Sequence, residues 1–345
     1  MMLIILSFIT AIFCYTFIPD RTPFSNRMNL LISNQSPGFT VQMLKIPSRE
    51  IFDDTGKLEA LVNGLPDKYD YVPIDSFHAK NGRLFYTEFS GEKKPSEFFK
   101  SVAVDNQNTL SNQIVSRTFL FGTDRYGRDL FSRIVAGTRV TLSVGLIAVI
   151  ISLVVGIFFG AIAGFFKGIT DQFVLWLINV IWSVPTLILV IAITLVLGKG
   201  FEQVFIAVGL TMWVDVARMV RGQLLSVREL EFVSAAKAMG FSNTRIIRKH
   251  LLTNIIGPVL VVAASNFSTA ILLEAGLSFL GIGAQPPTPS WGSMIKENYG
   301  YIIIPGSAYL AILPGLAIML LTMAFTFVAN GLRDAMDSKQ QINLA

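Results

Sequence analysis

Long apolar runs dominate the pattern of hydrophobic and polar positions along this chain. A helix that crosses the hydrocarbon core of a bilayer needs about 20 consecutive apolar residues. Runs of roughly that length predict six transmembrane helices, at residues 2–18, 140–165, 173–197, 201–217, 257–280 and 308–329. The pattern therefore predicts an all-α polytopic membrane protein.

The amino-acid composition also indicates a membrane protein, and it argues against a disulfide, a metal site and a nucleic-acid partner. Only 15% of the 345 residues are charged, whereas soluble domains carry about 25%. The net charge of +5 does not indicate a nucleic-acid partner, because cations between spans mark the cytoplasmic side. Cys14 is the single cysteine and lies in the first apolar run, so an intrachain disulfide is excluded and a membrane-buried thiol is expected. His78 and His250 are far apart, and no metal site is expected.

A basic, polar segment separates the fourth and fifth predicted spans, and we call residues 218–256 the basic loop. Its carboxylates are Glu229 and Glu231, and its more numerous cations are Arg218, Arg221, Arg228, Lys237, Arg245, Arg248 and Lys249. Lys and Arg concentrate in the cytoplasmic loops of membrane proteins. The basic loop is therefore predicted to be cytoplasmic, which places both termini in the cytoplasm and residues 19–118 outside it.

Two helices joined by a glycine are predicted within the basic loop. A helix over residues 228–239 would carry an apolar stripe at i, i+3, i+4 and i+7, formed by Phe232, Ala235, Ala236 and Met239. Gly240 suits a left-handed stop, and Ser242 can cap a second helix. The inner face of that helix would consist of Ile246, Ile247, His250 and Leu251. Such a unit fits a groove on a partner protein; the alternative is an amphipathic loop on the lipid headgroups.

The sequence of the basic loop resembles the EAA loop of ATP-binding-cassette (ABC) importers. The resemblance rests on the Ala235-Ala236 pair with Gly240 four residues after it. In that family the loop docks the permease onto its ATPase. The residues to which the resemblance assigns this coupling are Glu231, Ser234, Ala235, Ala236, Gly240, Arg245 and His250. The family pattern has Glu, Ile and Pro where this chain has Ser234, His250 and Thr253. The change to Thr253 removes a helix break before the fifth span.

Two further segments carry a closer resemblance. Residues 121–139 contain Gly-Thr-Asp-x-x-Gly-Arg-Asp, which resembles a segment of oligopeptide, dipeptide and nickel importer permeases. Residues 272–294 resemble the C-type permease subunit of peptide and nickel importers, and they are the most specific signal in the chain. The family-motif residues in these segments are Gly122, Asp124, Gly127, Arg128, Asp129, Pro289, Ser290, Trp291 and Gly292.

The resemblance and the hydropathy pattern together predict the domain organisation. Residues 1–18 would form the first transmembrane helix, and residues 119–338 a permease core with five more and the basic loop. A tail would follow at 339–345. Residues 19–118 lie outside the resemblance, and their short apolar runs are split by Pro, Gly, Asn and Asp, which predicts a small strand-containing extracytoplasmic insertion. The expected fold is the six-helix type I ABC importer kind with this insertion after the first helix.

Two features of the predicted spans concern helix packing. Small residues recur every four positions in the second span, at Ser152, Gly156, Gly160 and Gly164. This spacing lets two helix backbones approach closely, although it does not identify the partner helix. Pro185 lies inside the third span and is expected to kink it.

Glu274 is a carboxylate within the fifth predicted span. Ionisable residues in spans are costly, and they usually face the bundle interior or a water-filled path. One interpretation is that Glu274 is a translocation-path or gate residue. The other is that it is a buried structural group, hydrogen-bonded between helices.

The sequence predicts a non-catalytic permease subunit of an ATP-driven importer, with peptides as the cargo. No Gly-x4-Gly-Lys-Ser/Thr phosphate loop occurs, so the chain is not the nucleotide-binding subunit. We find no catalytic constellation, no directly bound cofactor and no metal ligand set. The resemblance implies a second permease, two ABC ATPases that bind ATP and Mg²⁺, an extracytoplasmic substrate-binding protein and a location among the lipids of a bacterial inner membrane.

Three alternatives remain at the sequence level. The cargo could be nickel or another small solute carried by the same family. An ATP-independent secondary transporter would need intramembrane ion ligands, for which only Glu274 and Asp215 qualify. A membrane-attached enzyme or receptor that uses residues 19–118 would rest on His78 alone.

Overall fold

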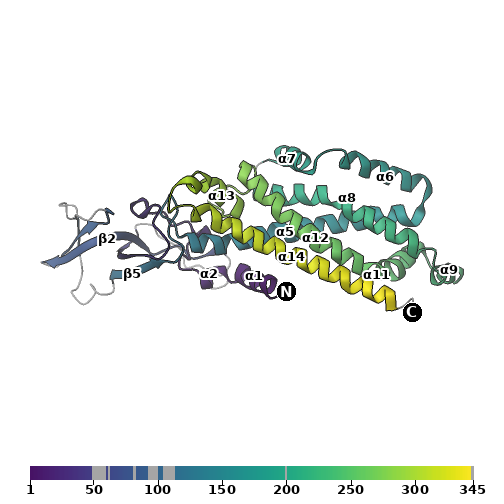
Figure 1. Cartoon of the computed structure of the whole chain (residues 1–345), viewed down its shortest axis with the longest axis horizontal. Helices are drawn as coiled ribbons and strands as arrows, with labels where there is room; N and C mark the ends of the chain where they lie inside the picture. The colour runs from purple at the N-terminus through teal and green to yellow at the C-terminus, as the bar shows by residue number, and fades with distance from the viewer. Residues whose placement is uncertain are drawn as a thin grey trace.

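The computed structural model describes residues 1–48, 60, 63–80, 83–91, 100–103, 113–198 and 200–342. These residues form an elongated molecule with a β-sheet at one end and a bundle of long helices behind it (Figure 1). The short helix α9 (Glu231–Ala238) and the C-terminal end of α14 (Tyr309–Ile342) lie at the end of the bundle opposite the sheet. The predicted helical membrane fold with a small strand-containing insertion is confirmed.

The described residues contain an element for each of the six predicted spans. Four helices are long and apolar enough to cross a membrane, namely α5 (Leu130–Phe166), α8 (Phe201–Val227), α12 (Ile256–Leu280) and α14. The pair α6 (Gly168–Trp182) and α7 (Thr186–Leu197) passes the same test only when the two helices are taken together, and their axes differ by 91°. The remaining element, α1 (Met2–Ile12), is apolar but shorter, and α2 (Cys14–Phe17) follows it.

Two spans predicted as single helices are broken in the structure. In the run 2–18 the helix stops at Phe13, where the backbone leaves the helical region (φ −104°, ψ 25°). In the run 173–197 the helix stops after Trp182 and restarts at Thr186. Pro185 has no N–H to donate and disfavours helical backbone in the residue before it. The expected kink at Pro185 is therefore a complete break.

Three other spans are longer than their apolar runs, and α14 is one of them, since it continues to Ile342 instead of ending at 329. The second span begins at Leu130, ten residues before the predicted start at 140, and the fourth ends at Val227 instead of 217. Residues 218–227 continue α8 because their apolar members stay on its buried face, as Val220 and Leu224 do. The first ten residues of the basic loop thus belong to a membrane-spanning helix.

The stripe of small residues on α5 packs against α8. A Cβ atom added at Gly156 would lie 2.5 Å from Val216 Cβ, and one at Gly164 would lie 2.8 Å from Leu224 Cβ. Such separations are too short for real side chains, so the glycines allow the two backbones to approach. Residue numbers rise together along the contact, which makes α5 and α8 parallel. Because α5 and α8 run in the same direction, the chain has to run back from the end of α5 to the start of α8, and the bent pair α6/α7 makes this connection.

The insertion contains a five-stranded antiparallel sheet with the order β4-β3-β2-β1-β5. Its strands are β1 (Phe39–Pro47), β2 (Tyr69–Lys80), β3 (Arg83–Glu88), β4 (Lys100–Ala103) and β5 (Ile114–Phe119). Successive side chains of a strand point to opposite faces, and β1 shows this alternation: Leu44 packs with Ile74 on one face, while Met43 packs with Phe119 on the other.

Short helices make up the rest of the described fold. They are η1 (Pro23–Ser25), η2 (Leu30–Ile32), α9, α10 (Asn243–Arg245), the π-helix η4 (Ile246–Leu251), α11 (Leu252–Asn254), α13 (Trp291–Asn298) and η5 (Tyr299–Ile303). Thr253 lies within α11, and α12 begins two residues after that helix ends. Ser242 occupies the N-cap position of α10 but its side chain makes no capping hydrogen bond, so its predicted role as a cap is wrong.

Candidate functional site

The basic loop packs as a small unit on the end of the bundle away from the sheet. Its inward side chains are almost fully buried with residues of α5, α8 and α12, and they are Val233, Ala236, Ile246, Leu251 and Ile255. The inner face predicted for the second helix is confirmed at Ile246 and Leu251, whereas Ile247 and His250 are half-buried. Burial of this apolar surface holds the loop against the spans.

Arg228 joins the basic loop to the end of α5. Its Nη1 atom donates to the carbonyl oxygens of Gly164 at 3.3 Å and Phe165 at 2.7 Å. The last carbonyls of a helix have no intrahelical partner, and a nearby cation satisfies them. Next to it, Lys167 donates to Glu229 at 2.9 Å, and the Lys167 ammonium holds the pKa of that carboxyl below its usual range. These contacts join the basic loop to the C-terminal end of α5.

The apolar stripe predicted on α9 is divided between two faces. Ala236 is buried together with Val233, but Phe232, Ala235 and Met239 point away from the bundle. Leu230, Phe232 and Met239 remain 50%, 38% and 65% exposed. Glu231, Ser234 and Arg245 are exposed as well. The basic loop therefore presents apolar side chains beside cations on its outer side, as expected of a surface that another protein or the lipid headgroups cover.

Gly240 ends α9 in a left-handed conformation, as predicted. Its φ is +76°, and the N–H of Phe241 donates to the carbonyl of Ala236 at 3.1 Å, which is the long hydrogen bond of a Schellman-type helix end. Phe241 then organises the second half of the loop, because His250 stacks on its ring at 6.0 Å and the Arg245 guanidinium lies 4.1 Å from its centroid.

A buried charged network lies at the opposite end of the bundle. Arg128 donates to Asp124 and to Glu297 at 2.6 Å each, and Arg133 lies 3.8 and 3.9 Å from the same two carboxylates. Both arginine side chains are only 2% exposed. Buried charges are tolerated only when they are paired and hydrogen-bonded. The two arginines and the two carboxylates satisfy one another, and their contacts hold α13 against the start of α5.

The motif glycines bring the insertion close to this network. Gly122 and Gly127 have φ values of +74° and +70°, in the left-handed region that favours glycine. A Cβ at Gly122 would collide with the carbonyl oxygen of Gln35, and one at Gly127 with that of Asn29. Asp129 caps α5, since its carboxylate accepts from the Ser132 N–H at 3.3 Å, and burial raises the pKa of that carboxyl.

The second motif packs directly on the first. Trp291 is buried, and its indole N–H donates to the carbonyl of Ile134 in α5 at 2.9 Å. Ser290 caps α13 in a reciprocal pair with Ser293, and a Cβ at Gly292 would collide with the backbone of Ala275 in α12. Pro289 precedes this cap. The structure thus brings all nine family-motif residues to one end of the bundle, although the two segments are far apart in sequence.

Glu274 lies inside the protein, among the buried residues of α12. Its side chain is 1% exposed. Ser278 donates to Glu274 Oε1 at 2.7 Å and accepts from the Ala284 N–H at 3.1 Å, and Ser290 lies beside the carboxylate. These contacts connect α12 to the turn that follows it and to the cap of α13. They favour the structural interpretation of Glu274 over that of a path residue.

Sequence reasoning missed Glu297 and the pairing of Arg133. Glu297 lies 169 residues from Arg128, and no spacing rule connects the two. The available signal was chemical: Arg128 and Arg133 lie beside a long apolar run, and cations in such a place need carboxylate partners.

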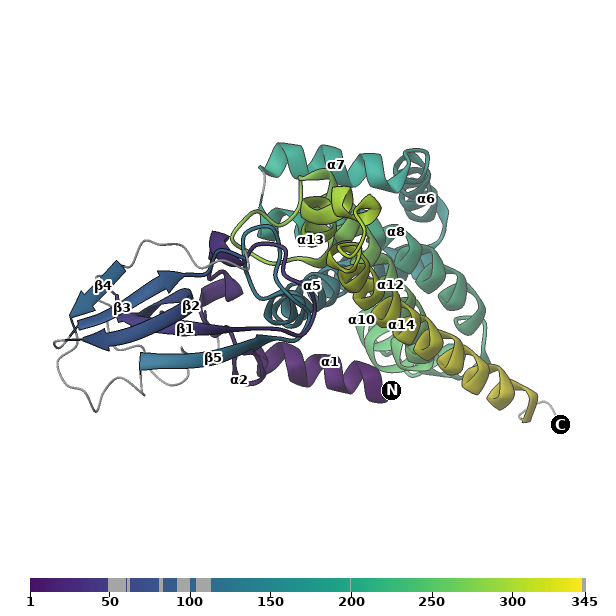
Figure 2. The same cartoon turned by 60° about the vertical axis from the view of Figure 1, so that its left-hand side comes forward.

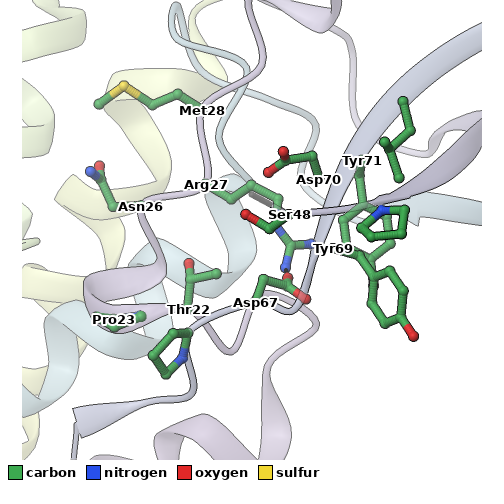
Figure 3. A pocket seen from close by; sticks show the side chains of 13 residues that line it. Thr22, Pro23, Asn26, Arg27, Met28, Ser48, Asp67, Tyr69, Asp70 and Tyr71 are labelled. Carbon is green, nitrogen blue, oxygen red and sulfur yellow. Dashed lines mark ion pairs between the residues drawn. The ribbon is translucent and has the colours of Figure 1, made fainter. Parts of the chain in front are cut away.

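A cavity of about 820 Å³ opens between strands β1 and β2 and the chain around η1 (Figure 3). Arg27 reaches across it to form an ion pair with Asp67, and its guanidinium lies 4.4 Å from the centroid of the Tyr71 ring. Burial lowers the pKa of Arg27. Within the described ranges no three His, Cys, Asp or Glu side chains come together as a metal site.

Comparison with known proteins agrees with these features. The model of the family described as "Binding-protein-dependent transport system inner membrane component" matches residues 156–341, more than half of the chain. The dipeptide transport system permease protein DppC of Alkalihalophilus pseudofirmus is 40% identical over 221 residues, which are 64% of this chain and 72% of that protein. The oligopeptide permease protein OppC of Bacillus subtilis is 37% identical over 227 residues, 65% and 73% of the two chains. The glutathione permease protein GsiD of Pectobacterium atrosepticum is 36% identical over 228 residues, 66% and 75%.

Proposed function

This chain belongs to the family of binding-protein-dependent transport system inner membrane components, and from that premise we propose that it forms half of the translocation path of an ATP-driven peptide importer. It is a multi-pass inner-membrane permease subunit and is itself non-catalytic. Peptides are the proposed cargo because the relatives named above are dipeptide, oligopeptide and glutathione permeases.

The proposed assembly contains three kinds of partner protein. A second permease completes the path, two ABC ATPases bind ATP and Mg²⁺, and an extracytoplasmic protein delivers the peptide. The part of the basic loop after α8, residues 228–256, faces the ATPases in the cytoplasm, and both termini lie on that side. Residues 19–118 lie outside, next to the end of the bundle where the peptide is delivered.

One observation carries the coupling part of the proposal. The outer side of α9 exposes Leu230, Phe232 and Met239, while the contact of Arg228 with the Phe165 carbonyl fixes the same loop to α5. An ATPase that binds the exposed side of α9 therefore moves α5, and it also moves α8, which packs along α5. Closure of the ATPases on ATP would shift a two-state equilibrium of the spans between inward and outward access.

The proposal is tested by uptake of labelled trialanine into vesicles that contain the full transporter with its partner subunits. We expect uptake that requires ATP and stops when the phosphate-loop lysine of the partner ATPases is replaced. Uptake that survives this replacement would indicate an ATP-independent transporter instead. Uptake of Ni²⁺ but not of trialanine would reassign the cargo while leaving the ATP-driven mechanism in place.

A further inference from the structure

The break between α6 and α7 lies beside charged side chains of α8. Trp182, the last residue of α6, donates its indole N–H to Asp215 Oδ1 at 3.2 Å. The guanidinium carbon of Arg218 lies 3.3 Å from the centroid of the Trp182 ring, which is a cation–π contact. These three side chains form one connected surface, which we call the break cluster.

The rest of the chain leaves the break cluster uncovered. Trp182 is 55% exposed, Asp215 is exposed and Arg218 is half-buried. Among the described residues, Arg218 forms no ion pair, and the Trp182 ring supplies its one close electrostatic contact. The bent pair lies at one edge of the bundle, with α1 on the opposite edge (Figure 2). The cluster therefore faces outward from this subunit.

Asp215 and Arg218 lie within or near the hydrocarbon core. α8 ends at Val227, beside Arg228 and the Lys167–Glu229 ion pair, charges that mark the cytoplasmic side. At 1.5 Å per residue, Asp215 lies about 18 Å from that end and Arg218 about 14 Å. The charge-poor part of α8 ends at Val220, just before the Arg221–Asp171 ion pair, so Asp215 lies within the hydrocarbon core and Arg218 lies near its edge.

Lipid tails are a poor cover for this surface. Charged side chains at this depth face the bundle interior or a water-filled cavity. Non-helical backbone is likewise tolerated only where protein buries it or water reaches it, yet residues 183–185 are non-helical and exposed. The exposed face of α5 is different in character, because Ile150, Val154 and Phe158 form an apolar stripe at i, i+4 and i+8, which suits lipid.

We infer that the break cluster lines the water-filled translocation path and contacts the charged ends of a peptide in transit. The inference rests on the proposed function, which supplies the path and its cargo. Asp215 offers a carboxylate to the peptide ammonium group, and Arg218 offers a guanidinium to its terminal carboxylate. The two residues are three positions apart on a helix and so share one face of α8. Trp182 positions both.

The first test measures water access at the break. Ser183→Cys is introduced in the assembled transporter and treated with a membrane-impermeant methanethiosulfonate, and labelling of this subunit is quantified. The unsubstituted chain gives the blank, because its single cysteine, Cys14, is buried. Val154→Cys is the matched control: it is 66% exposed on the apolar stripe of α5. We expect Ser183→Cys to be labelled and Val154→Cys to remain unlabelled.

The second test measures uptake of labelled trialanine by Asp215→Asn, which keeps the side-chain size, and by Arg218→Gln, which leaves a shorter polar side chain; each removes one charge. Loss of a charge-assisted contact to the moving peptide is expected to lower the maximal uptake rate roughly tenfold. The concentration for half-maximal uptake should not change, since the binding protein sets it. Saturating trialanine should also slow labelling of Ser183→Cys, which a purely structural role of the cluster would not do.

The outcomes separate this inference from the proposed function. An unlabelled Ser183→Cys would show that lipid or the second permease covers the cluster, and would overturn the inference while wild-type peptide uptake stands. Equal labelling of Val154→Cys, or wild-type uptake by both charge variants, would also overturn it. Absence of ATP-driven trialanine uptake by the wild type would instead contradict the proposed function.

Discussion

Gly240 ends α9 with a φ of +76°, and a Cβ placed there would meet no atom within 4 Å. A substitution at this position is therefore opposed by backbone strain alone. The left-handed conformation costs an L-residue about 1–2 kcal/mol, and a β-branched residue more. We expect Gly240→Val to displace α9, and peptide-dependent ATP hydrolysis by the reconstituted transporter should fall while membrane insertion is kept.

The matched control for this change is Gly331→Val. Gly331 is also surrounded by open space, but it lies within α14 and has no positive φ. This variant should couple ATP hydrolysis to transport as the wild type does. Normal coupling in Gly240→Val would contradict the assignment of α9 to the ATPase contact.

Glu274 gives a second prediction at the scale of one residue. The structure shows its Oε1 accepting from Ser278, so Glu274→Gln keeps an acceptor and should transport peptide at near wild-type rates. Glu274→Leu leaves a buried hydroxyl without its partner, at a cost of about 1–3 kcal/mol, and should lower thermal stability in membranes. Ser278→Ala removes the donor to Glu274 and the acceptor of the Ala284 N–H, so it should lower thermal stability as Glu274→Leu does. A transport defect in Glu274→Gln at equal membrane level would restore the path interpretation.

The residue scale also shows what sequence patterns leave out. Gly122, Gly127 and Gly292 were identified by resemblance, and the structure supplies the reason for each as a close backbone approach. The pairing of Arg128 with Glu297 could not be identified, because it depends on how α13 folds back over α5. Periodicity describes neighbours along one helix and contains no information on such long-range contacts.

Among the elements, the contact between the basic loop and α5 is open to a direct test. Arg228→Ala removes two hydrogen bonds to the carbonyls of Gly164 and Phe165, at a cost of about 1.5–3 kcal/mol for a charged donor. The loop should then move without carrying α5, so ATP hydrolysis should continue while trialanine uptake falls. Arg248→Ala is the control, since Arg248 is an exposed cation of the same loop. Equal uptake by the two variants would contradict a coupling role for this contact.

The sequence predicted helix boundaries well where a helix starts together with its apolar run. It predicted them poorly where a helix continues beyond its apolar run or is broken within it. The runs 257–280 and 308–329 begin within one residue of α12 and α14, because both helices start where apolar residues start. The end of α8 was missed by ten residues, because Arg218 and Arg221 lie on a polar face of a helix that continues. Pro185 was recognised, but the local rule for proline does not give the size of the resulting bend.

At the scale of the whole molecule, the sheet and the basic loop lie at opposite ends of one helical bundle (Figure 1). Four long helices and a bent pair separate them, so a membrane around the bundle places them on opposite sides. The charged network of Arg128, Arg133, Asp124 and Glu297 lies at the end of the bundle near the sheet, and Arg228 lies at the other. Each end of α5 is thus fixed by buried or half-buried arginine contacts, and α5 can transmit movement between the two sides.

This arrangement predicts the sidedness of the chain. A reporter enzyme that is active only after export should be active when fused after Asn63, which lies in the insertion, and silent when fused after Asn243, which lies in the basic loop. A reporter that is active only in the cytoplasm should give the reverse pattern at the same two positions and so controls for expression. The cations of the basic loop favour this orientation, because Lys and Arg are retained on the cytoplasmic side. If the export reporter were instead active at Asn243 and silent at Asn63, the exposed side of α9 would lie outside the cytoplasm. No cytoplasmic ATPase could then bind it, and the coupling mechanism proposed for this permease would be wrong.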